Sequence, residues 1–169
     1  MKRILVTLLL ASASLSGLAQ MPAMDHATKP KAAPSTTLMV TAAGKMVTYT
    51  PADLAAMPQK TIKVSNFHTK TDQTYTGVVL ADLLAKSGAD IGKLLLRTYI
   101  KATGTDKYWV LYSGIEIDPA SHMGDTIVAL TLDGQPLADN GAFQLVSSDD
   151  KKPQRWVRNL TALTVVLPE

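Results

Sequence analysis

The chain has 169 residues, no cysteine, and a formal net charge of +3 from 17 basic and 14 acidic residues. Without cysteine it cannot form disulfide bonds, use a thiol in catalysis or bind a metal through a thiolate. The small basic excess does not indicate a nucleic-acid partner, and the length suits one domain behind a short leader.

Residues 1–19 have the three-part pattern of a secretory signal peptide. Lys2 and Arg3 form a charged start, residues 4–11 an apolar run, and residues 17–19 a small-x-small cleavage site. The apolar run is too short for a permanent membrane anchor. Cleavage leaves 15 basic against 14 acidic residues, a net charge of +1. We therefore expect a periplasmic or secreted protein with no membrane span after cleavage.

Residues 20–36 are predicted to be a flexible leader, because they are rich in Pro, Ala, Ser and Lys and have no apolar period. A single domain is predicted over residues 37–169. Met21, Met24 and His26 lie close together in the leader and offer thioether and imidazole groups, which suit copper(I). Metal binding by the leader and an ordinary disordered leader are both open interpretations.

The domain begins with a predicted hairpin and a short helix. Residues 38–43 and 45–49 alternate as two strands do. Thr50 is predicted to cap a helix that starts at Pro51, and Asp53 gives the spacing of a capping box. A further strand is predicted over residues 61–67, from the alternation of its apolar residues.

The stretch from Gln73 to Gly88 combines a strand end, a corner and a helix. Gly77 is predicted to form the corner, where a residue without Cβ avoids a clash. The helix is predicted to have one apolar face, formed by Leu80, Leu83 and Leu84. Asp82 near its start and Lys86 in its last turn carry charges that suit the helix dipole. Gly88 is predicted to end the helix in the left-handed conformation.

The remaining chain is rich in strand patterns. Residues 98–103 and 107–112 predict two strands, the second with one buried and one open face. Residues 126–132 form a near-continuous apolar run, typical of a strand buried on both faces, and a turn follows at Asp133-Gly134. A last strand is predicted over residues 161–167. Eight or nine short strands with two or three short helices indicate an α+β fold.

Several motifs, in this order, resemble one known family. They are YTGVVLADLLAKSG at 75–88, a Gly-Thr-Asp-Lys-Tyr turn at 104–108, IVALTLDGQPL at 127–137 and NGAFQLVSSDDKKPQRWVRNL at 140–160. Together they resemble the oxidoreductase molybdopterin-binding domain, the fold of sulfite oxidase and its exported bacterial relatives. The likeness extends from about Gly44 to Val166. It implies a sulfite oxidase-like fold, with molybdopterin as the implied cofactor.

Two departures from the family pattern bear on activity. Enzymes of this family bind molybdenum through a cysteine thiolate, and this chain has no cysteine. Where the family commonly shows Gly-Pro-Leu-Arg, this sequence has Gly-Ala-Phe-Gln at 141–144, so the neutral amide of Gln144 replaces an arginine. An amide still forms hydrogen bonds but provides no charge. No catalytic residue and no protein ligand to a metal are therefore predicted.

The predicted ligand site is the charged segment 149–158 with two further side chains. Its cations suit phosphate or carboxylate groups, and an aromatic ring offers a stacking face. The proposed ligand-binding residues are Lys151, Lys152, Arg155, Arg158, Gln144 and Tyr108. The alternative is a solvated surface, on which Asp149 and Asp150 pair with the cations and contribute little.

Three functions follow from these observations. The first is an exported, non-catalytic binding domain that holds a small anionic or planar ligand or a periplasmic protein partner. The second is an oxidoreductase that holds the molybdopterin cofactor without a cysteine ligand. The third is metal handling by the Met/His leader. Metal analysis of the purified protein distinguishes the second from the first.

Overall fold

The computed structural model describes residues 32–67, 69–89 and 95–167. Their strands are β1 (Leu38–Ala42), β2 (Lys45–Tyr49), β3 (Lys60–Ser65), β4 (Asp72–Val79), β5 (Tyr99–Gly104), β6 (Trp109–Ser113), β7 (Thr126–Leu132), β8 (Gln135–Pro136), β9 (Gln144–Ser147) and β10 (Leu160–Val166). The helices are α1 (Pro51–Ala55), α2 (Leu80–Lys86) and α3 (Gly114–Ile117), with 3-10 turns η2 (Leu95–Arg97), η3 (Ala138–Asn140) and η4 (Pro153–Arg155). The predicted α+β class is confirmed.

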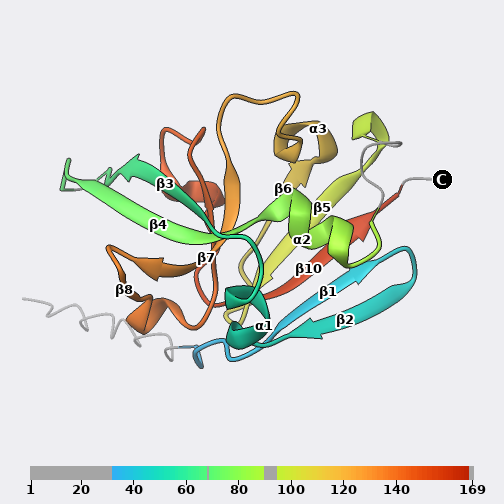
Figure 1. Ribbon diagram of the computed structural model, residues 1–169, viewed down its shortest axis with the longest axis horizontal. Helices are drawn as coiled ribbons and strands as arrows, with labels where there is room; N and C mark the ends of the chain where they lie inside the picture. The colour runs from blue at the N-terminus through green and yellow to red at the C-terminus, as the bar shows by residue number, and fades with distance from the viewer. Residues whose placement is uncertain (1–31, 68, 90–94, 168–169) are drawn as a thin grey trace, which may run out of the picture. The chain divides into compact units, whose positions relative to one another are not determined.

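The strands form two sheets (Figure 1). The first has the order β2-β1-β10-β5-β6, in which β1 and β10 are parallel and the other neighbours antiparallel. The second has the order β3-β4-β7-β8, and β9 also pairs with β7. The predicted hairpins around Gly44 and Gly134 are both present, with these glycines at φ +74° and +76°.

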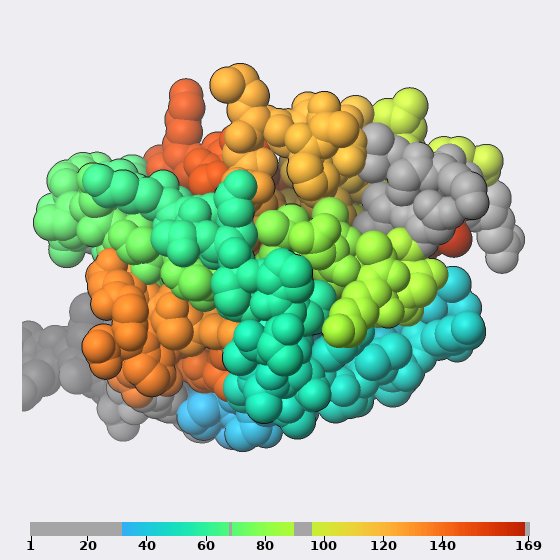
Figure 2. All heavy atoms as spheres, viewed as in Figure 1, coloured from blue at the N-terminus to red at the C-terminus, as the bar shows by residue number. Residues whose placement is uncertain are grey.

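A large apolar core joins the two sheets and the helices. It contains fully buried side chains from the first sheet, the second sheet and α2, among them Val40, Ile100, Leu163, Val128, Leu145, Leu80, Leu83 and Leu84. Each fully buried leucine contributes about 1.5–3 kcal/mol of hydrophobic stabilisation. The predicted apolar face of α2 is confirmed, because its three leucines are buried. Figure 2 shows α1 and α2 on the same face of the molecule.

A smaller core lies on the other face of the second sheet. On β7, Ile127 belongs to this smaller core and Val128 to the large one, so the strand is buried on both faces as predicted. Tyr75 from β4 and Val146 from β9 are buried in the smaller core, and Trp156 packs against it. The segment that carries Trp156 therefore lies over this face of the sheet.

The helix ends agree with the sequence patterns. Thr50 and Asp53 form the capping box of α1, with Pro51 as the first helical residue. Gly88 follows α2 at φ +91°, where a residue without Cβ is favoured. In β6, Tyr112 is buried and Trp109 is exposed, which confirms one closed and one open face.

The predicted corner at Gly77 is wrong. Gly77 lies inside β4, which continues to Val79, at a β-bulge in its pairing with β7. A Cβ at this position would lie 2.0 Å from the carbonyl oxygen of Val128. The glycine is needed because two backbones approach closely, rather than because the chain turns.

The predicted signal peptide and the group of Met21, Met24 and His26 lie outside the described residues. Residues 32–36, the end of the predicted leader, have no regular secondary structure but contact the fold: the Thr105 hydroxyl donates to the Ala33 carbonyl, and the Ala142 amide to the Ser35 carbonyl. Within the described ranges, no helix is long and apolar enough to cross a membrane.

Candidate functional site

The segment between β9 and β10 is attached to the second sheet by a β-bridge. Leu145 and Val157 exchange two backbone hydrogen bonds, of 2.9 and 3.1 Å. Val157 is buried in the large core, whereas its neighbours Trp156 and Arg158 do not join that core. The bridge thus orients Trp156 and Arg158 toward the face that carries the smaller core.

Two buried polar atoms on this face have no hydrogen-bond partner among the described residues. They are the Oε1 atom of Gln144, whose residue is 2% exposed, and the Nε1 atom of Trp156. Both side chains border Tyr75: the Trp156 ring meets the Tyr75 ring edge-on at 5.7 Å, and Gln144 hydrogen-bonds to the Tyr75 hydroxyl. Since such atoms are nearly always satisfied in folded proteins, this acceptor and this donor define a candidate binding site.

Arg158 adds a positive charge beside the same tyrosine. Burial raises the pKa of Tyr75, and the Arg158 guanidinium and the hydrogen bond from Gln144 oppose this increase without cancelling it. Tyr75 is therefore neutral at physiological pH and acts as a polar, uncharged wall. Arg158 itself is exposed. We call Tyr75, Gln144, Trp156 and Arg158 the Tyr75 cluster.

Arg155 has a different environment, although it lies only three residues before Arg158. Its guanidinium forms ion pairs of 2.7 Å with Glu116 and 2.7 Å with Asp150, and lies 4.6 Å from the ring centre of Tyr112. The Tyr112 hydroxyl donates to the Arg155 carbonyl at 3.1 Å. The cation is thus bound to two carboxylates from the protein itself.

The pKa directions agree with this arrangement. Partial burial disfavours a charge on Arg155, but its bonds to Asp150 and Glu116 outweigh burial and raise its pKa. Burial likewise opposes the Glu116 carboxylate, and hydrogen bonds from Ser113 and Arg155 outweigh it and lower the pKa of Glu116. Arg155 and its partners therefore form a charged structural unit that fastens α3 to the segment after β9.

The remaining predicted site residues have other partners. Lys152 places its Nζ atom 5.1 Å from the Phe67 ring centre, the Tyr108 hydroxyl donates to the Gln154 carbonyl, and Lys151 is exposed. The alternative interpretation of the segment predicted that Asp150 pairs with one of its cations, and the structure shows this pair between Asp150 and Arg155. Asp149 instead pairs with His122 at 2.8 Å.

Of the six predicted residues, the structure thus brings Gln144 and Arg158 together around one tyrosine. Sequence reasoning missed Tyr75 as a site residue and Glu116 as a partner of Arg155. Neither has a local signal, because Tyr75 reaches Gln144 only through the pairing of β4 and β9 with β7. Trp156 packs against the smaller core and has an unpartnered Nε1 atom.

The two sheets with short helices have the sulfite oxidase-like fold that the sequence motifs predicted. A solved structure with this architecture is the sulfane dehydrogenase SoxCD from Paracoccus pantotrophus, with a TM-score of 0.60 and 18% sequence identity. The match covers 76% of this chain and 37% of that chain. At this identity the similarity establishes the fold alone. No protein-family model matches the sequence, and no curated protein does either.

The residues present do not fit a protein-ligated molybdenum centre. The sequence has no cysteine, and no three His, Cys, Asp or Glu side chains of the described ranges are grouped so that they could hold a metal ion. Arg155 is bound to two carboxylates. The organic part of such a cofactor is a better match, because a pterin ring has both donor and acceptor atoms and the Tyr75 cluster offers one of each.

Proposed function

We propose that this protein is an exported, non-catalytic binding domain that holds a small planar, anionic ligand on a sulfite oxidase-like scaffold. The observation that carries the proposal is the pair of buried, unpartnered atoms in the Tyr75 cluster, Gln144 Oε1 and Trp156 Nε1. A buried polar atom without a partner costs about 1–3 kcal/mol. Because both atoms are buried, a ligand reaches them only when the partly exposed Trp156 ring moves aside, and pairing with both atoms then recovers this free energy.

The cluster indicates the chemistry of the ligand. Gln144 Oε1 accepts a hydrogen bond and Trp156 Nε1 donates one, so the ligand must present both a donor and an acceptor. The exposed guanidinium of Arg158 suits a carboxylate or phosphate group in forked geometry. A heteroaromatic ring with an anionic substituent meets these requirements.

The absence of a thiol supports binding rather than turnover. No side chain of the chain offers the thiolate through which related enzymes hold molybdenum. Arg155, the most strongly paired cation of the segment, is committed to Glu116 and Asp150 and is not available to a substrate. The scaffold thus keeps a recognition surface and lacks the metal ligand of an oxidoreductase.

A titration with pterin-6-carboxylate, which is planar, anionic and fluorescent, tests the proposal. We expect saturable binding that weakens at least about tenfold in Gln144→Met, which keeps the side-chain length and removes the acceptor. Arg158→Met is expected to weaken binding by a similar factor. Lys151→Met is the matched control, because it removes an exposed cation of the same segment outside the cluster.

Two results would contradict the site. Equal affinity of the unmodified protein, Gln144→Met and Arg158→Met would show that the Tyr75 cluster does not bind the probe. An equal loss in Lys151→Met and Arg158→Met would show that the probe responds only to the net positive charge of the segment.

A further inference from the structure

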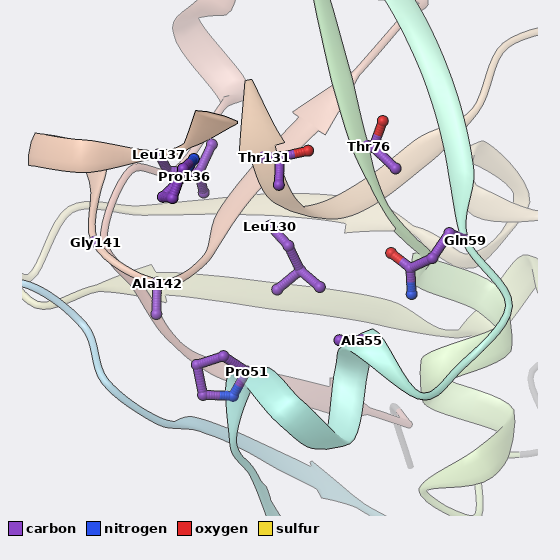
Figure 3. A pocket seen from close by; sticks show the side chains of 10 residues that line it. All are labelled: Pro51, Ala55, Gln59, Thr76, Leu130, Thr131, Pro136, Leu137, Gly141 and Ala142. Atoms are coloured by element: carbon purple, nitrogen blue, oxygen red, sulfur yellow. The ribbon is translucent and has the colours of Figure 1, made fainter. Parts of the chain in front are cut away.

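A pocket beside the second sheet shares no lining residue with the Tyr75 cluster. It has a volume of about 430 Å³ and lies between α1, β7 and the segment around η3 (Figure 3). Gln144 pairs with Ala129, whose side chain belongs to the smaller core, whereas Leu130 packs against the large core. None of the four cluster residues lines the pocket, although one lining residue, Leu137, belongs to the smaller core.

A β-bulge shapes the pocket. Thr76 pairs with Thr131 and Gly77 with Ala129, so Leu130 has no partner residue on β4. A bulge of this kind redirects the side chain of the extra residue. In Figure 3 the Leu130 side chain lies at the centre of the lining residues, with Pro51 and Ala142 on one side and Gln59 on another. The bulge thus supplies the apolar floor.

The polar end of the pocket is held in place by α1. The Nε2 atom of Gln59 donates to the carbonyls of Leu54 and Met57, at 2.7 and 2.8 Å. With both amide hydrogens used, its Oε1 atom is left as an acceptor, and Figure 3 shows this oxygen directed toward the pocket. The orientation of the amide is thereby fixed by backbone atoms and not by a ligand.

We propose that this pocket is a second binding site, for a small neutral alcohol with an apolar body. Among the residues that the structure describes, the lining is apolar apart from Gln59 and two threonines, and none of the lining side chains is charged. A carboxylate or an ammonium group would lose hydration there without a compensating charge. A hydroxyl group, in contrast, donates to Gln59 Oε1 while the apolar part covers Leu130. The volume lies within the range of about 300–1,000 Å³ of small-molecule sites.

Three probe molecules of similar size test the chemistry: 2-phenylethanol, ethylbenzene and phenylacetate. In two-dimensional ¹H–¹⁵N spectra of the full chain, we expect 2-phenylethanol to give saturable shifts at the amides of Leu130, Thr131 and Ala142, with affinity in about the millimolar range. Ethylbenzene, which has no donor, is expected to bind several-fold more weakly, and phenylacetate not to saturate. Equal affinity for all three would overturn the proposed recognition by Gln59.

A matched pair of helix variants tests the location. Ala55 and Ala52 are both exposed on α1, and of the two only Ala55 lines the pocket. Ala55→Leu is expected to fill the space and weaken 2-phenylethanol binding at least about fivefold, whereas Ala52→Leu stays within about twofold. The same affinity in both variants, or no saturable shifts in the unmodified protein, would overturn the site. Gln144→Met, which tests the Tyr75 cluster, is expected to leave this binding unchanged, so the two proposals fail separately.

Discussion

Arg155 and Arg158 belong to one basic segment, yet they have different environments. Arg155 is held by Glu116 and Asp150, and its side chain is 35% exposed. Arg158 is exposed, and its charge acts on the buried Tyr75, which also borders Gln144 and Trp156. The first arginine connects parts of the fold, and the second is the one that we propose meets a ligand. A run of cations in a sequence therefore does not define one site, because the acidic residues that fold against it decide which charges remain available.

The largest expected difference between the two arginines concerns stability. Arg155→Met leaves Asp150, whose side chain is 11% exposed, and Glu116 without their cation. Breaking a fully buried pair costs about 3–5 kcal/mol, and partial exposure reduces this to about 2 kcal/mol here. The free energy of unfolding, measured with urea, checks this value. A change below about 0.5 kcal/mol would contradict the structural role of Arg155.

The dependence of the free energy of unfolding on pH tests the structural role of the pair between Arg155 and Glu116. The folded-state pKa of Glu116 lies below its ordinary value of 4.5, so its contribution is present above pH 4.5 and is lost as the pH falls through the folded-state pKa. Glu116→Gln is expected to be less stable than the unmodified protein at pH 7 and to approach it at low pH. Urea unfolding at several pH values measures this. Parallel curves for the two proteins would rule out the contribution of Glu116.

Gln144→Met is expected to change stability less than Arg155→Met does. The substitution removes one unpartnered buried acceptor and also the hydrogen bond to Tyr75, so the two effects oppose each other. We expect the free energy of unfolding to change by no more than about 1 kcal/mol. A loss as large as that of Arg155→Met would show that Gln144 is a structural residue, and would remove the basis for its role in binding.

The smallest expected effect on stability is that of Arg158→Met. The side chain is exposed, and such substitutions usually change stability by less than about 0.5 kcal/mol. Thermal unfolding of this variant beside Arg155→Met compares the two arginines directly. Similar losses in both variants would contradict the division into a structural and a recognition cation.

The parts of the fold that depend on neighbouring residues could be predicted from the sequence. The capping box at Thr50, the apolar face of α2 and the turns at Gly44 and Gly134 all depend on spacings of a few residues. Gly77 could not be interpreted correctly, because its role depends on the backbone of Val128, 51 positions further along the chain. A glycine alone does not distinguish a corner from a close approach of two strands.

The candidate site could be predicted only in part, for the same reason. Arg158 lies in the charged segment 149–158, and Gln144 stands where the family resemblance leads one to expect an arginine, so both could be predicted from the sequence. The pairing of Arg155 with Glu116 joins residues 39 positions apart, and the contact of Tyr75 with Trp156 depends on the second sheet. No spacing in the sequence reports either contact.

The most direct test of the central claim is an intact-mass and metal measurement on folded protein purified from a host that makes the molybdenum cofactor. Because the chain has no cysteine and pairs Arg155 internally, we predict a small organic ligand, or none, and molybdenum far below one atom per chain. One molybdenum atom per chain, retained through purification, would contradict the assignment of this domain as a non-catalytic binding protein.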